Sequence, residues 1–293
     1  PNAMGGREVG ALANTLTAHM EFDNPNHISL VKDFWQTEQL ATTPGLKAID
    51  MFDSMAEGKI KAVWIMATNP VVSLPDSDKI KKALKTCPFV VVSDCIADTE
   101  TTRFADVVLP AQGWSEKSGT VTNSERRISR QRRVLPSPGL AKPDWWIISQ
   151  IARKMGFQDA FNYLHEGEVF REYANLTTQG NQEGQRDLSL IGLTQLDDAG
   201  YSRLTPQQWP VKTIQTEPVN QRMFTNHQFY TPDGRANFVA VQYCAPKSTV
   251  SNAYPLLLNS GRTRDHWHTM TRTGLSTRLA DHSPEPFVLI HLK

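Results

Sequence analysis

The sequence predicts an α/β fold built around a parallel sheet, and three features of the chain support this prediction. Continuous apolar runs occur at residues 62–66, 89–92 and 107–110, as in strands buried on both faces. Stretches typical of helices, at residues 77–85 and 98–105, separate these runs. Turn residues follow the first run. Strands and helices that alternate at these lengths form βαβ units.

Helices are expected on both sides of this strand region in the sequence. Before it, we predict helices over about 11–20, 30–40 and 48–57, with a turn at residues 23–26. After it, residues 144–155 show a strong amphipathic pattern that ends at a glycine, a residue that commonly terminates helices.

The remainder of the chain is less regular. One more helix is expected over residues 161–173. The turn residues Pro232-Asp233-Gly234 predict a hairpin between residues 229 and 238. A second β region is expected to open at about Tyr254.

Composition excludes several function classes. The 293 residues carry a net charge of +1, so no global field selects nucleic acid or a membrane surface, and no apolar run reaches the ~18 residues of a membrane span. The cysteines Cys87, Cys95 and Cys244 fit no metal-binding spacing, and their odd number argues against a disulfide framework, which favours a reducing compartment. Because the chain begins at Pro1 and ends within an expected strand, we expect it to be a piece of a longer parent protein.

Polar residues follow the predicted strands at the edge where open parallel sheets bind ligands. Asn69 follows the first strand, Ser93 and Asp94 end the second, and Lys117 lies in the loop after the third. An aspartate here can accept two hydrogen bonds from a guanine base or from ribose hydroxyls. The alternative interpretation makes Asn69 a turn residue and Asp94 a helix N-cap. Glycine-rich dinucleotide and P-loop motifs are absent, which argues against a standard dinucleotide or ATP site.

The run from Ser260 to Gly274 combines three arginines, two histidines, a tryptophan and several hydroxyl side chains behind the apolar residues 256–258. An apolar strand that leads into a Gly-Arg-Thr turn would bring backbone N–H and guanidinium groups to one spot, which suits a phosphate or another anionic ligand. A solvated basic loop is the alternative. A second basic run, from Arg126 to Arg133, is interpreted as a solvated edge that pairs with acidic neighbours.

Several motifs resemble the molybdopterin oxidoreductase family, in sequence and in order. They are residues 64–70 (WIMATNP), 92–94 (VSD), 105–110 (ADVVLP), 114–119 (WSEKSG), 123–127 (NSERR) and 261–272 (GRTRDHWHTMTR). Within the family, the chain is most similar to the catalytic subunits of cytoplasmic assimilatory nitrate reductases. Residues 1–10 and 208–210 support that narrower resemblance.

The resemblance implies a bis(molybdopterin guanine dinucleotide) cofactor that holds one molybdenum atom. It implies a Rossmann-like domain over residues 58–250, after a helical lead-in over residues 1–57, and the start of a β-barrel domain over residues 251–293. No catalytic residue and no metal ligand is expected within the chain. The cofactor contacts implied by the resemblance are Asn69, Ser93, Asp94, Lys117, Asp144, Ser260, Gly261, Arg262, Thr263, Arg264, Asp265, His266, Trp267, His268 and Thr269.

The resemblance also implies what the parent protein does. It would reduce nitrate to nitrite in the cytoplasm, with electrons that a donor subunit or carrier supplies through a [4Fe-4S] cluster outside this chain. The chain alone is expected to be inactive, and neither nucleic acid nor a membrane is an expected partner. Two alternatives stay open: another molybdopterin oxidoreductase, such as a formate dehydrogenase or a periplasmic-type nitrate reductase, and a non-catalytic nucleotide-binding module.

Overall fold

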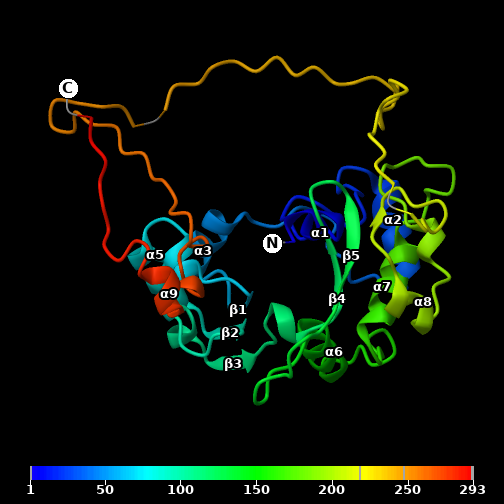
Figure 1. Ribbon diagram of the computed structural model, residues 1–293, viewed down its shortest axis with the longest axis horizontal. Coiled ribbons are helices and arrows are strands. Elements are labelled where there is room, and N and C mark those ends of the chain that lie inside the picture. The colour runs from blue at the N-terminus through cyan, green and yellow to red at the C-terminus, as the bar shows by residue number, and fades with distance from the viewer. Residues whose placement is uncertain (1, 218, 247, 292–293) are drawn as a thin grey trace.

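A three-stranded parallel sheet forms where the apolar runs predict it, at one side of the molecule (Figure 1). The computed structural model describes residues 2–217, 219–246 and 248–291. The strands are β1 (Ala62–Met66), β2 (Phe89–Asp94) and β3 (Val107–Pro110), paired in the order β1-β2-β3. The register places Met66 beside Ser93 and Asp94 beside Pro110. The carboxyl ends of the three strands therefore lie along one edge, which we call the rim.

Two predicted helices cover this sheet. They are α3 (Ala48–Ala56) and α5 (Ser77–Thr86), which pack against each other. A third, short helix, α4 (Pro70–Ser73), follows β1 directly. One hydrophobic cluster joins the helices to the sheet through the buried side chains Phe52, Met55, Ile65, Val71, Ile80, Leu84, Val90 and Val92. Burial of these side chains positions the rim, because it holds the strands that end there.

The helix predicted over residues 98–105 is wrong in extent. Only a single 3₁₀ turn forms, η1 (Thr102–Phe104). The hydroxyls of Thr99 and Thr102 accept hydrogen bonds from each other's backbone N–H groups, at 3.1 and 2.7 Å. Such side-chain bonds offer the backbone an alternative to the α-helical pattern, which explains the shorter element.

A second sheet, which the sequence did not predict, lies on the other side of the molecule (Figure 1). It is antiparallel and consists of β4 (Gly119–Thr122), β5 (Arg127–Gln131) and β6 (Gln207–Gln208). Its strands are mostly polar, so they lack the apolar runs that identify a buried strand. The segment between the sheets contains the 3₁₀ turn η2 (Trp114–Glu116).

Two helices near the second sheet, α2 and α7, begin at residues whose side chains cap them. Helix α2 (Pro25–Trp35) starts five residues before the predicted position, because the Asn24 side chain accepts a hydrogen bond from the Asn26 N–H. Helix α7 (Glu166–Leu176) starts where the His165 side chain accepts from the Gly167 N–H. The other helical elements of this side are α1 (Ala3–Glu8), α6 (Asp144–Lys154), η3 (Ile191–Leu193) and α8 (Asp198–Arg203). Helix α6 confirms the amphipathic prediction.

The helix predicted over residues 11–20 does not form. These residues make a tight loop in which Gly10, Ala18 and His19 have positive φ angles of 76°, 52° and 56°. A Cβ on Gly10 would lie 1.4 Å from the Leu16 carbonyl oxygen. The loop closes onto α1, since the Ala18 N–H donates to the Glu8 carbonyl. A helix is incompatible with these positive φ angles.

The last part of the chain leaves both sheets as an extended segment and returns beside the parallel sheet (Figure 1). The predicted turn forms, with the Gly234 N–H bonded to the Thr231 carbonyl, but no hairpin strands flank it in the described residues. After residue 248, the described chain holds no strand and only η4 (Thr273–Leu275) and α9 (Thr277–Ala280). Strands need neighbouring strands to pair with, and no strand pairing involves the described residues of this segment. The β-barrel therefore stays a prediction.

Candidate functional site

Asn69 lies at the rim, where β1 ends and α4 begins, and its side chain is buried. Its Oδ1 accepts a hydrogen bond from the Thr101 hydroxyl at 2.6 Å, and its Nδ2 donates to Glu100 Oε2 at 2.9 Å. The bond from Asn69 lowers the pKa of the Glu100 carboxyl. Asn69 thus positions polar side chains at the rim in addition to preceding a proline.

Asp94 and Ser93 end β2 and are both buried. Asp94 Oδ1 accepts from the Ile96 N–H at 3.1 Å, which makes a local turn and no helix N-cap. The Ser93 hydroxyl accepts from the indole N–H of Trp64 on β1 at 2.8 Å. The carboxylate of Asp94 therefore keeps acceptor capacity at the rim, while Ser93 is already bonded within the sheet.

The arginine-rich run reaches the rim through two residues that follow the predicted contacts. The Thr271 hydroxyl accepts a hydrogen bond from Asn69 Nδ2 at 3.2 Å, across 202 residues of sequence. The Arg272 guanidinium lies 4.0 Å from Asp94 Oδ1. Glu100, Thr101, Thr271 and Arg272 are site residues that the predicted set did not include. Asn69 and Asp94 thus meet the downstream segment at the rim.

The predicted contacts from Ser260 to Thr269 are mostly exposed and bond to one another or to nearby residues. Asp265 pairs with His282 at 3.0 Å and with Arg264 at 3.1 Å. Hydrogen bonds from these two partners lower the pKa of the Asp265 carboxyl, and the bond from His282 has the larger effect. His266 Nδ1 lies 3.1 Å from the Thr273 hydroxyl. No contact described for this stretch joins it directly to Asn69 or Asp94.

Lys117 and Asp144 form an ion pair of 2.6 Å, with Asp144 as the first residue of α6. They continue the rim beyond β3, because the backbone of residues 111–112 bonds both to Asp94 and to Lys142. A cavity of about 470 Å³ lies beside the pair. Lysines, an arginine and two tryptophans line it, namely Lys117, Lys142, Arg133, Trp145 and Trp146, together with Glu116 and Glu166.

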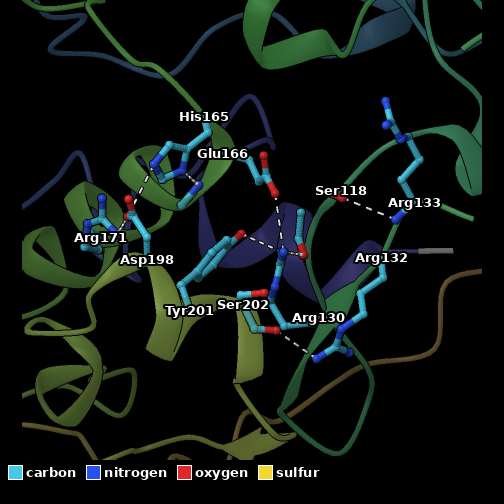
Figure 2. Close-up of polar contacts among 12 residues, drawn as sticks. Ser118, Arg130, Arg132, Arg133, His165, Glu166, Arg171, Asp198, Tyr201 and Ser202 are labelled. Atoms are coloured by element: carbon cyan, nitrogen blue, oxygen red, sulfur yellow. Dashed lines mark hydrogen bonds and ion pairs between the residues drawn. The ribbon is translucent and has the colours of Figure 1, made fainter. Parts of the chain in front are cut away.

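The interpretation of the basic run as a solvated edge is wrong for Arg130, whose side chain is only 6% exposed. It donates to the Tyr201 hydroxyl at 2.8 Å and to Glu166 at 3.3 Å, and its guanidinium lies 3.9 Å from the centre of the Tyr201 ring (Figure 2). Burial raises the pKa of Tyr201 to about 12. Arg130 thus joins β5 to α7 and α8. Only Ile128 is apolar among residues 127–131, so the sequence carried no periodic signal for this strand.

A much larger cavity, of about 1,960 Å³, lies between α1, the loop after it and the segments around residues 180–187 and 209–232. Several basic side chains line it, including Arg7 and Arg126. At its wall, His19 Nδ1 lies 2.8 Å from Asp187 Oδ1. We call this the large cavity.

Among the described residues, no group of three histidine, cysteine or acidic side chains is arranged to hold a metal ion. No described helix is long and apolar enough to cross a membrane.

Comparison with known proteins identifies the family. The molybdopterin oxidoreductase family model matches residues 2–154. Nitrate reductases from Shewanella frigidimarina and Klebsiella oxytoca are 52% and 49% identical to this chain over 99% and 98% of its length, which corresponds to 31% and 32% of theirs. An F420-dependent formate dehydrogenase subunit alpha from Methanocaldococcus jannaschii is 33% identical over 99% of this chain and 40% of its own length. The chain spans about a third of the nitrate reductases that it matches. It belongs to the molybdopterin oxidoreductase family.

Proposed function

We propose that this chain forms part of the binding site for a molybdenum–pterin cofactor with guanine dinucleotide arms, in an enzyme that reduces nitrate to nitrite. The observation that carries the proposal is the meeting of Asp94 with Arg272 at the rim, 4.0 Å apart. A buried carboxylate can accept hydrogen bonds from the N–H groups of guanine, and a guanidinium can bind phosphate. The two groups together suit a ligand that is a base at one end and anionic at the other.

The other residues along the rim fit the same kind of ligand. The cavity of about 470 Å³ beside Lys117 falls in the range of small-ligand pockets, roughly 300–1,000 Å³. Its lysines and arginine suit phosphate, and its tryptophans suit a flat ring system. We propose Asn69, Ser93, Lys117 and Asp144 as nucleotide contacts of a Rossmann-like domain. The exposed run from Ser260 to Thr269 is the proposed contact of the pyrophosphate and pterin.

The proposed reaction is shared between the cofactor and the protein. When bound, the cofactor would supply the two-electron chemistry, while the protein orients it and balances its charge. We propose nitrate as the substrate because relatives named nitrate reductases are 49–52% identical over this chain, against 33% for the formate dehydrogenase subunit. The electrons would come from a donor partner through a [4Fe-4S] cluster outside this chain.

The test replaces Asp94 in the full-length protein. Asp94→Ala removes the proposed base acceptor, and loss of a hydrogen bond to a charged group costs about 1.5–3 kcal/mol. We expect the molybdenum content and the guanosine monophosphate released by acid hydrolysis to fall about tenfold or more. Asp98→Ala is the matched control, because Asp98 is exposed and pairs only with Arg103 among the described residues. Normal cofactor content in Asp94→Ala would refute the assignment.

Activity assays with nitrate and with formate distinguish the two candidate substrates. We expect reduced methyl viologen to drive nitrate reduction, and we expect no formate-dependent reduction of oxidised viologen. Formate oxidation without nitrate reduction would favour the formate dehydrogenase alternative while leaving the cofactor site intact.

A further inference from the structure

A histidine–aspartate pair at the wall of the large cavity lies outside the set of cofactor contacts proposed above. His19 Nδ1 lies 2.8 Å from Asp187 Oδ1, and both residues line the cavity. Because an ionised carboxylate only accepts hydrogen bonds, Nδ1 is the donor, and Nε2 is the nitrogen left for another partner. None of the described residues is hydrogen-bonded to Nε2. A histidine held in this way at a cavity is suited to general acid–base catalysis.

The surrounding structure fixes the imidazole in place. The imidazole and the Trp209 indole form a T-shaped contact, with an angle of 83° between the ring planes and 5.6 Å between the ring centres. The Trp209 indole N–H in turn donates to the buried Glu8 carboxylate at 2.6 Å. Ala18 and His19 both have positive φ angles, which are unfavourable for residues with a Cβ and persist only where the surroundings enforce them. Such conformations cluster at functional sites, where they orient a side chain.

The other histidine–aspartate pairs in the described residues differ from this one. His165 shares Asp198 with Arg171, and His282 shares Asp265 with Arg264. Neither pair lines the two cavities described above. Of these three pairs, that of His19 combines a carboxylate partner with access to a ligand-sized space. The ionisable groups facing it are Glu8 of α1, Arg126 over the Trp209 ring, Tyr173 of α7, Arg186 and Tyr230.

We infer that His19, oriented by Asp187, donates a proton to a ligand in the large cavity. The identity of the acceptor rests on the proposed function. Reduction of nitrate follows NO₃⁻ + 2H⁺ + 2e⁻ → NO₂⁻ + H₂O: one N–O bond breaks, nitrogen is reduced by the electrons of the donor, and the departing oxygen takes up both protons. The His19 imidazolium supplies one of these protons and becomes neutral, and solvent supplies the other. Solvent then returns a proton to His19.

The experiment compares two cavity histidines in the full-length holoenzyme. His19→Gln keeps a hydrogen-bonding group but cannot transfer a proton. The matched control is His27→Gln, because His27 lines the same cavity while its Nδ1 accepts from the Glu21 N–H and no described carboxylate forms an ion pair with it. With nitrate and reduced methyl viologen, we expect kcat of His19→Gln to fall about 10²-fold or more at little change in KM, as for loss of a general acid.

Two further measurements distinguish proton donation from a structural role. Exogenous imidazole should restore activity to His19→Ala, since the large cavity can admit it, and should not affect His27→Gln. The second measurement needs no turnover: a protonated imidazole quenches a neighbouring indole, so His19→Gln should raise tryptophan fluorescence in acidic buffer. We expect no such rise in His27→Gln, and none when His19→Gln is combined with Trp209→Phe.

The outcomes are separable from those of the proposed function. A normal kcat and pH profile in His19→Gln would overturn the inference while leaving nitrate reduction established. Unchanged tryptophan fluorescence in His19→Gln would also overturn it, whatever the activity. A holoenzyme that shows this fluorescence change but reduces no nitrate would refute the proposed substrate and not the protonation of His19 beside Trp209.

Discussion

At the scale of single residues, Glu8 shows how burial changes the pKa of a carboxylate. It ends α1 and is 3% exposed. Its oxygens accept hydrogen bonds from the Thr122 hydroxyl at 2.8 Å and the Trp209 indole at 2.6 Å, which are both neutral donors. Burial raises the pKa of Glu8, and the two hydrogen bonds only partly oppose this effect. The charged form is therefore disfavoured in the folded protein.

We predict that Glu8→Gln removes a pH dependence of stability. Because the pKa of Glu8 is raised above its ordinary value of 4.5, the unfolded chain loses this proton first as pH rises. Stability then falls with rising pH between the unfolded and the folded pKa, by up to about 1.4 kcal/mol per pH unit. Glutamine stays neutral and can keep both partners. Urea unfolding at several pH values should show this decline in the wild type and a flatter profile in Glu8→Gln.

Glu8→Ala is the contrasting variant. It leaves the buried Trp209 and Thr122 donors without an acceptor, so we expect it to lose about 1–3 kcal/mol at every pH. If Glu8→Gln were as unstable as Glu8→Ala across the pH range, the account of Glu8 as a disfavoured charge would be wrong.

At the scale of elements, the strand β5 is held to two helices by one arginine. Arg130 bonds to Glu166 at the start of α7 and to Tyr201 in α8, and stacks on the Tyr201 ring (Figure 2). Arg132 lies just beyond the end of β5 at Gln131, is exposed, and among the described residues bonds to the Ser202 carbonyl (Figure 2). The strand pairing that positions Arg130 therefore stops before Arg132.

We predict that Arg130→Ala destabilises the protein by about 3–5 kcal/mol, because it leaves the Glu166 carboxylate and the Tyr201 hydroxyl without their partner. Arg132→Ala is the control, and we expect a change within about 0.5 kcal/mol. Urea unfolding midpoints measure both. Arg130→Lys should lie between them, since lysine keeps the charge but loses the planar fork. Equal midpoints for the two alanine variants would contradict this role of Arg130.

At the scale of the whole molecule, the buried apolar side chains of the described residues form three clusters. None of the residues after 235 that the structure describes belongs to them. It carries apolar runs at residues 238–243, 256–258 and 287–290, and most of their large side chains are more than 60% exposed. Exposed runs of this kind favour association.

We predict that the 293-residue chain associates through these runs. The triple variant Val239→Lys, Leu257→Lys and Val288→Lys should lower the mass measured by light scattering at micromolar concentration, because each lysine adds charge within an apolar run. A charge-matched control places lysines at exposed polar positions of the same segment outside these runs, namely Ser248, Thr249 and Asn252. If the control reduced association equally, net charge would be the cause and the apolar runs would not.

The parallel sheet was predictable because its strands are apolar runs, and α5 and α6 because their apolar residues recur along one face. The antiparallel sheet was not, since β5 has two arginines and its partner β6 lies about 80 residues away in sequence. At the rim, Asn69 and Asp94 could be placed from the strand ends alone. Thr271 and Arg272 could not be selected over the earlier part of the same run, because nothing local says which residue of a loop reaches a distant surface.

By itself, the amino-acid order determined where strands end and which polar groups follow them, since side-chain periodicity and turn chemistry act over a few residues. Only the tertiary structure decided which distant partners those groups meet: His19 with Asp187 across 168 residues, and Asn69 with Thr271 across 202. Such pairings depend on how the buried clusters bring segments together, and that packing is a property of the whole chain.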